Sequence, residues 1–182
     1  MTRVAWYALG LLVGMAPGFT GYWFRPEAWY FEELRRPSWN PPAWIFGPVW
    51  TTLYVFMGIV LTRLLLMRSA LADPHSKAWT AMTPAMGARV RGLAMTQASV
   101  HVSHALVMFG IQWVFNALWS PLFFGMKSPM LGLVDIALLW LTLRRMIPVL
   151  WRIDRVAAGL FIPYFAWVSF ATALNAAIVQ LN

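Results

Sequence analysis

Five long apolar stretches dominate the sequence, and mostly short connections separate them. They cover residues 4–24, 47–67, 101–124, 130–150 and 156–181. A helix that crosses the hydrocarbon core of a bilayer needs about 20 such residues, and a helix satisfies its own backbone hydrogen bonds in lipid. The pattern therefore predicts an all-α membrane protein, a bundle of five transmembrane helices that forms a single domain over residues 1–182.

Composition supports this class and excludes several others. Hydrophobic residues make up 60% of the chain and charged residues only 11%, which leaves too little polar surface for a soluble domain. Cysteine is absent, which excludes a disulfide framework, a thiolate metal site and a cysteine nucleophile. No catalytic-triad motif, phosphate-binding loop or dinucleotide fingerprint is present, so residue spacing alone predicts no enzyme. The first stretch has no small-residue cleavage site, and we expect it to be retained as a span.

The net charge of +8 points to a membrane surface and not to nucleic acid, because the Lys and Arg residues lie between the apolar stretches. With five spans, the N-terminus and the second and fourth connections share one side, which then carries ten of the 14 cations. In a bacterial inner membrane this predicts the N-terminus inside and the C-terminus outside. The rule does not extend to an outer membrane, so inner and outer membrane both stay open.

The third apolar stretch carries a polar and aromatic face. Its residues recur every three or four positions and are His101, His104, Met108, Gln112, Phe115 and Trp119, with Asn116 beside them. Polar groups are costly toward lipid, so we expect this face to point inward or into a water-filled cavity. Similar faces of the second and last stretches comprise Trp50, Tyr54, Tyr164, Trp167, Ala171, Asn175 and Ile178.

Two interpretations of these faces stay open. Trp50, Trp119 and Trp167 either line a ligand cavity or pack in the core. An aromatic, apolar lining with a few hydrogen-bonding groups suits a flat, largely apolar ligand. Asn116 and Asn175 either contact that ligand or bond between helices. The two histidines of the third stretch have a spacing that metal ligands use, but no third ligand is evident, and we expect no metal site.

Small residues mark candidate helix contacts, because they let backbones approach closely. On the third stretch, opposite its polar face, lie Ser103, Gly110 and Ala117, and we predict that a homodimer forms there. The first stretch carries Gly10, Gly14, Gly18 and Gly21, which we expect to pack within the monomer. One face of the fourth stretch comprises Leu131, Asp135, Leu138 and Thr142, and Asp135 is its acid well inside a span.

Three segments resemble the translocator protein family, also called the tryptophan-rich sensory proteins (TspO/MBR) and including the peripheral-type benzodiazepine receptors. They are RPSWNPPAWIFGPVWTTLYVFMG (residues 36–58), FNALWSPLFFGMKSPMLGLVD (115–135) and PYFAWVSFATALNAAIVQLN (163–182). Their order and spacing fit the family over nearly the whole chain. The resemblance implies five transmembrane helices, usually in a dimer, around a pocket that the first connection closes.

The resemblance also implies a ligand. Members bind porphyrins such as protoporphyrin IX, sterols in some cases, and synthetic ligands, without an obligatory cofactor. Bacterial members are linked to the regulation of tetrapyrrole and carotenoid synthesis, and some are reported to promote light-dependent breakdown of protoporphyrin IX with two tryptophans, which by motif position are Trp50 and Trp167. Ligand-binding residues carried over by motif are Trp39, Trp44, Tyr54, Asn116, Trp119, Leu131, Trp167, Ala171 and Asn175. The end of the chain lacks the tyrosine and following basic residue of the sterol motif, so sterol binding is not expected.

The Pro/Trp-rich segment between the first two stretches is predicted to be a lid loop. Its prolines, Pro37, Pro41, Pro42 and Pro48, fix a non-helical path at low entropic cost. That path would hold its tryptophans over the bundle, and the arginines at its mouth, Arg25, Arg35 and Arg36, suit ligand carboxylates. The connection over residues 68–100 is longer than the family pattern and is either an ordinary loop or partly a helix on the membrane surface.

Three functions stay open, because one aromatic pocket serves them all. The leading interpretation is a tetrapyrrole-binding sensor or transport protein. The second is a catalyst of light-dependent porphyrin degradation. The third is a structural or regulatory partner protein whose pocket is incidental.

Overall fold

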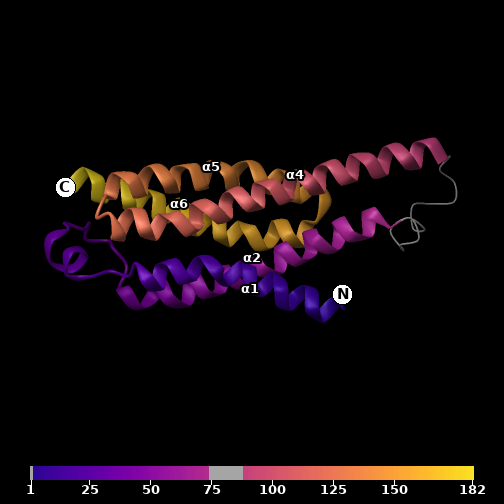
Figure 1. Cartoon of the computed structure of the whole chain (residues 1–182). Coiled ribbons are helices and arrows are strands. Elements are labelled where there is room, and N and C mark those ends of the chain that lie inside the picture. The colour runs from indigo at the N-terminus through magenta and orange to yellow at the C-terminus, as the bar shows by residue number, and fades with distance from the viewer. Residues whose placement is uncertain (1, 74–87) are drawn as a thin grey trace.

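The computed structural model describes residues 2–73 and 88–182, with side chains from residue 92 onward in the second part, and is mostly helical (Figure 1). The long helices are α1 (Arg3–Trp23), α2 (Ala43–Ala72), α4 (Ala88–Ser120), α5 (Pro129–Ile153) and α6 (Arg155–Leu181). Two π-helical turns, η1 (Trp29–Glu33) and η2 (Pro121–Gly125), lie before α2 and α5. The described residues contain no strand, which confirms the all-α prediction. The described residues contain more helical elements than the five predicted, because η1 and η2 form helical turns within the connections before α2 and α5.

Among the described residues, four segments are long and apolar enough to cross a membrane: α1, α2, residues Gly92–Gly125 and α6. The prediction of five such spans is therefore too high by this measure. The exception is α5, because each of its 18-residue stretches holds at least three charged residues. Of these charges, Asp135 is buried inside the bundle, whereas Arg144 and Arg145 are exposed.

The helices run side by side along the molecule, so the connections gather at two ends (Figure 1). The α1–α2 connection, η2 and the C-terminus lie at one end, which we call the aromatic end. Toward the other lie the N-terminus, the last turn of α2 and the α5–α6 junction. We call this the arginine end, after Arg63, Arg68, Arg152 and Arg155.

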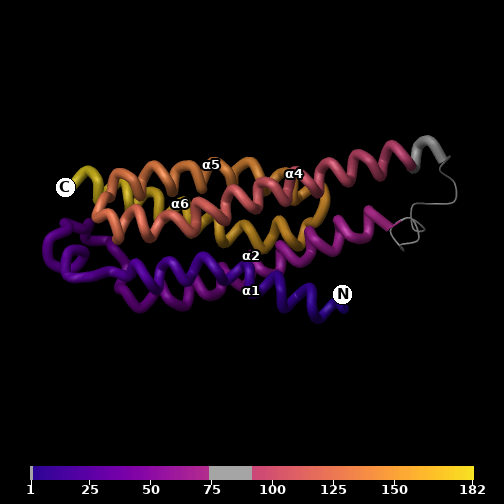
Figure 2. The backbone as a smooth tube through the Cα atoms, in the orientation of Figure 1, coloured from indigo at the N-terminus to yellow at the C-terminus, as the bar shows by residue number. Residues whose placement is uncertain are grey.

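The connection predicted over residues 68–100 is helical at both of its edges. Helix α2 continues to Ala72, and α4 already begins at Ala88. Figure 2 shows that α4 continues its own axis here and does not turn onto a separate surface helix. The prediction failed because neither edge contains a proline, so nothing in the local chain forces the helix to stop. Trp79, Met82 and Met86, on which the surface-helix alternative rested, lie outside the described residues.

Glycines bring α1 and α2 into backbone contact, as the spacing in the first stretch predicted. A Cβ atom added to Gly14 would lie 2.5 Å from the backbone nitrogen of Gly58, and one added to Gly10 would lie 2.7 Å from the Gly58 carbonyl oxygen. Thr62 joins the two helices as well, since its hydroxyl donates to the Trp6 carbonyl at 3.2 Å. The prediction that these glycines pack within the monomer is confirmed.

At the arginine end, Asp154 forms an ion pair and also caps helix α6. Asp154 separates α5 from α6, and its Oδ1 accepts hydrogen bonds from the amides of Val156 and Ala157 at 3.0 and 3.2 Å. Both carboxylate oxygens also accept from the guanidinium of Arg63 on α2. Burial raises the pKa of Asp154, but the Arg63 hydrogen bond, the two amides and the Arg63 charge together lower that pKa below its ordinary value of 3.8. The carboxylate thereby ties α2 to the α5–α6 junction.

Candidate ligand cavity

The aromatic end encloses a cavity of about 1390 Å³. All long helices contribute to its wall, together with the α1–α2 connection and η2. Its aromatic side chains are Phe19, Tyr22, Trp23, Tyr30, Phe31, Phe46, Trp50, Tyr54, Trp119, Phe123, Phe124 and Trp167. The cavity is therefore bounded mainly by rings, which expose faces and edges for stacking.

Two groups of stacked rings contribute to this wall. On α2 the rings of Trp50 and Tyr54 stack with centroids 5.5 Å apart, and Trp50 meets Trp167 of α6 edge-on at 6.5 Å. Near η2 the rings of Trp119 and Phe123 stack at 4.8 Å. The spacing of α2 explains its contribution, because positions four residues apart lie on one helical face.

The polar groups of the wall are few and mostly satisfied. The Asn175 carbonyl accepts from Trp119 Nε1 at 3.2 Å, and its amide donates to the Pro129 carbonyl at 2.8 Å. Asn116 donates to the Tyr164 hydroxyl at 2.8 Å. Two buried atoms of lining residues, Asn116 Oδ1 and Trp167 Nε1, have no hydrogen-bond partner among the described residues. The wall thus contains one buried acceptor and one buried donor without a partner among the described residues.

The α1–α2 connection forms one side of the cavity and is tied down at two points. Tyr30 is buried among the rings, and its hydroxyl donates to Asn40 Oδ1 at 3.3 Å. The second tie is Asn182, whose side-chain amide exchanges two hydrogen bonds of 3.0 Å with the backbone of Arg35. The Arg36 guanidinium lies 4.9 Å above the Tyr30 ring. Arg36 and Arg25 line the cavity, which places positive charge beside its rings.

The structure brings most of the predicted site residues together. The cavity lining includes Trp50, Tyr54, Asn116, Trp119, Trp167, Ala171 and Asn175. Trp39, Trp44 and Leu131 lie outside this lining, with exposed fractions of 49%, 75% and 39%. Trp39 instead packs its edge on Phe170 at 5.9 Å. Trp44 stands in the first turn of α2, so the proline path carries it away from the cavity.

The inward face predicted for the third stretch is correct toward the aromatic end only. Gln112 and Asn116 are buried, and Trp119 lines the cavity, but His104 is exposed. His101 lines a different pocket at the arginine end. The face changes along the helix because the part of α4 near the arginine end has fewer helices beside it (Figure 2). On the predicted dimer face Gly110 is exposed, and Ser103 and Ala117 are half-buried.

Several lining residues escaped the sequence analysis. Phe46 and Phe123 stand four residues from Trp50 and Trp119, so extending the helical spacing by one turn would have found both. Tyr30 carries no such signal, because η1 is a turn of five residues, too short to show a helical period. Its position depends on contacts with η2, including Phe124 at a centroid distance of 5.4 Å.

Known proteins resemble this chain in sequence over most of its length. The sequence profile of the TspO/MBR family matches residues 6–181. The chain is 39% identical to the tryptophan-rich protein TspO of Chlorobaculum tepidum, over 96% of this chain and 95% of that protein. It is 31% identical to the tryptophan-rich sensory protein of Cereibacter sphaeroides (92% and 85% covered) and 29% identical to the translocator protein of Homo sapiens (85% and 75% covered). With its apolar helices and this match over nearly its whole length, the chain is an integral membrane protein that belongs to the TspO/MBR family.

Proposed function

We propose that the chain is a membrane sensor or transport protein that binds a tetrapyrrole, such as protoporphyrin IX, and regulates tetrapyrrole or carotenoid metabolism. The observation that carries the proposal is the ring-lined cavity of about 1390 Å³. Pockets for drug-sized ligands measure about 300–1,000 Å³, so this cavity suits a larger ligand. The names of the relatives, sensory protein and translocator protein, fit sensing or transport.

The chemistry of the wall supports a flat ring that carries carboxylates. Stacking on Trp50 and Trp167 would hold the ring, because aromatic faces and edges attract one another. Arg25 and Arg36 would pair with ligand carboxylates. Asn116 Oδ1 would accept a hydrogen bond from a polar group of the tetrapyrrole, and Trp167 Nε1 would donate one. The other proposed contacts are Tyr54, Trp119, Ala171 and Asn175.

Two parts of the bundle complete the proposal. Residues 24–42 would act as a lid, since this connection supplies one side of the cavity and has side-chain ties at Asn40 and Asn182. Helix α5 would cross the membrane as the fifth span of a single domain. Its acid, Asp135, is buried inside the bundle, which is where a charge within a span is tolerated.

Titration of the purified protein with protoporphyrin IX tests the proposal. Tryptophan fluorescence is followed in the dark, and the porphyrin absorbance is then followed under light. Saturable quenching in the dark without light-driven product supports a sensor or transport protein. A total absence of saturable binding would favour the third function, a partner protein with an incidental pocket.

A light-dependent porphyrin-degrading activity is the second candidate. It is favoured by the indole rings of Trp50 and Trp167, which meet at 6.5 Å and 89° in the cavity wall. An indole beside an excited porphyrin would donate an electron to it, and dioxygen would take that electron from the reduced porphyrin. The indole radical cation would then take an electron from the porphyrin ring, so that the porphyrin is oxidised and dioxygen is reduced. Trp50→Phe and Trp167→Phe should preserve packing and abolish the light-dependent loss of porphyrin absorbance. Degradation at the unchanged rate in both variants would leave these tryptophans a packing role only.

The proposed homodimer uses the face of α4 that carries Ser103, Gly110 and Ala117. A Cβ added to Gly110 meets no atom within 4 Å, so this glycine serves no contact inside the described monomer. Close approach of two helices in lipid depends on such small residues. Gly110→Leu should therefore abolish crosslinking of two copies in membranes while ligand binding persists. Dimers that survive Gly110→Leu would assign the interface to another helix.

A further inference from the structure

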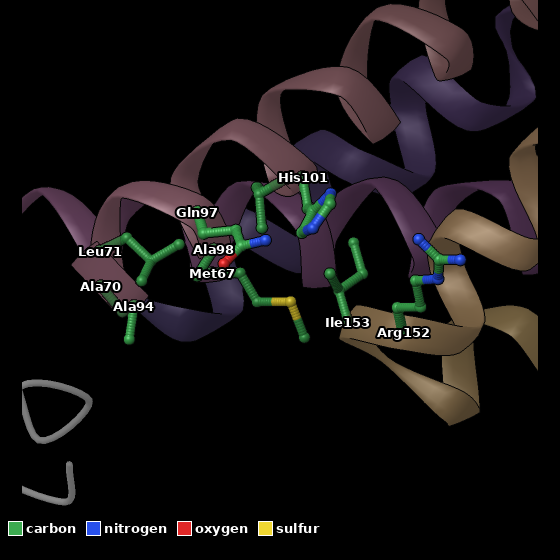
Figure 3. Close-up of a pocket in the computed structure, with 10 residues that line it drawn as sticks. Met67, Ala70, Leu71, Ala94, Gln97, Ala98, His101, Arg152 and Ile153 are labelled. Atoms are coloured by element: carbon green, nitrogen blue, oxygen red, sulfur yellow. The ribbon is translucent and has the colours of Figure 1, made fainter. Parts of the chain in front are cut away.

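A second pocket, of about 510 Å³, lies at the arginine end (Figure 3). Its walls come from the last turns of α2, the early part of α4 and the α5–α6 junction. Alanines on two facing helices, Ala70, Ala94 and Ala98, leave the space between α2 and α4 unfilled. Met67 and Ile153, which Figure 3 labels, and the buried Val102 make its lining apolar. The pocket is separate from the aromatic cavity, with which it shares no lining residue.

The polar side chains that line this pocket are those of Gln97, His101 and Arg152. In Figure 3 the His101 imidazole extends from α4, and the Arg152 guanidinium extends from the end of α5, on either side of Ile153. Among the side chains that the structure describes, no carboxylate pairs with Arg152, and the nearby carboxylate of Asp154 is engaged by Arg63. The pocket therefore combines an apolar interior with an uncompensated cation at its edge.

We propose that this pocket binds one anionic phospholipid. Its phosphate would contact Arg152 and His101, and the first part of an acyl chain would lie along Met67 and Ile153. The arginine end also carries Arg68 and Arg155, so the local field favours an anion. Basic pockets between transmembrane helices are sites where anionic headgroups bind. A free anion would gain nothing from the apolar interior, and a zwitterionic lipid would gain less from Arg152, because its own cation offsets the charge of its phosphate.

Native mass spectrometry of the purified full chain tests the proposal by counting retained phospholipids. Phosphatidylglycerol and phosphatidylcholine with identical acyl chains are added separately to detergent-solubilised protein. The wild-type chain should retain one phosphatidylglycerol at about fivefold lower lipid concentration, the gain expected for one arginine near an anionic headgroup. Arg152→Gln should remove this preference, and Ala98→Phe should reduce retention of both lipids because the ring fills the pocket.

Arg145→Gln is the matched control, because Arg145 is exposed on the same helix and outside the pocket. It should leave the preference intact. Equal retention of both lipids by the wild type, or equal loss in Arg145→Gln and Arg152→Gln, would overturn the proposal. Displacement of the lipid by inorganic phosphate alone would assign the site to a free anion. A changed dimer fraction with unchanged lipid retention in Ala98→Phe would assign the surface to a second copy of the chain.

Discussion

The two ends of the bundle are built from the same helices but hold them apart in different ways. At the aromatic end, large rings of α2, α4, η2 and α6 surround a cavity of about 1390 Å³. At the arginine end, alanines leave a pocket of about 510 Å³, and the Arg63–Asp154 pair ties the helices beside it. One end is thus organised by ring packing and the other by charge and helix capping.

This difference predicts how each end responds to change. Ring packing depends on shape, so the aromatic end should respond to loss of side-chain volume and hardly to pH. Charge depends on protonation, so the arginine end should respond to acid. The α1–α2 contact at Gly14 and Gly58 lies between the two ends, so its loss should affect both of them.

Gly14→Leu should have the largest effect, because it separates α1 from α2 and so damages both ends together. The added Cβ alone would lie 2.5 Å from the backbone of Gly58, where no side-chain rotation can relieve the clash. We expect destabilisation of about 3 kcal/mol, the upper part of the usual range for overpacking. Thermal unfolding in detergent measures it. Gly159→Leu is the control, since Gly159 is exposed on α6 and its added Cβ meets nothing within 4 Å; equal unfolding temperatures in the two variants would contradict the prediction.

Asp154→Ala should destabilise the arginine end by about 2–3 kcal/mol, because it removes both a helix cap and a partly exposed ion pair. The cap and the pair can be separated, since Asp154→Asn keeps an oxygen that accepts from Val156 and Ala157 but loses the charge. The loss in Asp154→Asn should be about half as large. Porphyrin affinity at the aromatic end should not change in Asp154→Asn, and a parallel loss there would show that the ends are not independent.

Acid offers a second way to test the arginine end. The pKa of Asp154 in the folded chain lies below its ordinary value of 3.8. Its contribution to stability is therefore complete above pH 3.8 and is lost as the pH falls through the lowered value. Unfolding temperatures of the wild type and Asp154→Asn should converge in that acid range. If the difference in unfolding temperature between the two proteins stays constant down to the lowest pH, the charge of Asp154 does not contribute to stability.

The sequence predicted the parts of this architecture that depend on local pattern. Apolar length predicted the helices, and the glycine spacing of α1 predicted its contact with α2. It did not predict the long helical edges of the 68–100 connection, because hydropathy falls there while helix propensity does not. By length and composition, four described segments could span a membrane and α5 is not among them, because of its charges. The proposed span of α5 rests instead on the burial of Asp135 inside the bundle, which composition does not show.

In the cavity, too, some lining residues follow from local sequence pattern and others only from tertiary contacts. Trp50, Trp119 and Trp167 follow helical spacing and line the cavity, and they also pack against the core, so both interpretations still stand. Trp39 and Trp44 do not line it, because direction in an irregular segment is set by turns that spacing does not encode. Tyr30 lines it through contacts with η2, about 90 positions away in the sequence, and only the folded chain brings the two together.

Trp167→Ala should weaken porphyrin binding by about 1–3 kcal/mol, the range for a base stacked on an aromatic side chain. The control is Trp151→Ala, which removes a half-exposed ring at the arginine end. Fluorescence titration in the dark measures both, with a thermal scan to verify folding. If Trp151→Ala weakens binding as much as Trp167→Ala does, tryptophan content and not the cavity wall determines affinity.

Asn182→Ala should have the smallest effect and should act on kinetics. The Asn182 amide bonds both the amide and the carbonyl of Arg35, in a way that mimics a strand pairing, and so holds the α1–α2 connection against α6. These bonds are exposed to solvent, so their loss should cost about 0.5–1 kcal/mol. Porphyrin dissociation, followed by stopped-flow displacement, should accelerate about two- to fivefold. Gln180→Ala, an exposed neighbour for which no side-chain hydrogen bond is observed among the described residues, should dissociate at the wild-type rate. An unchanged rate in Asn182→Ala would mean that Tyr30 and the rings around it hold the connection without this tie.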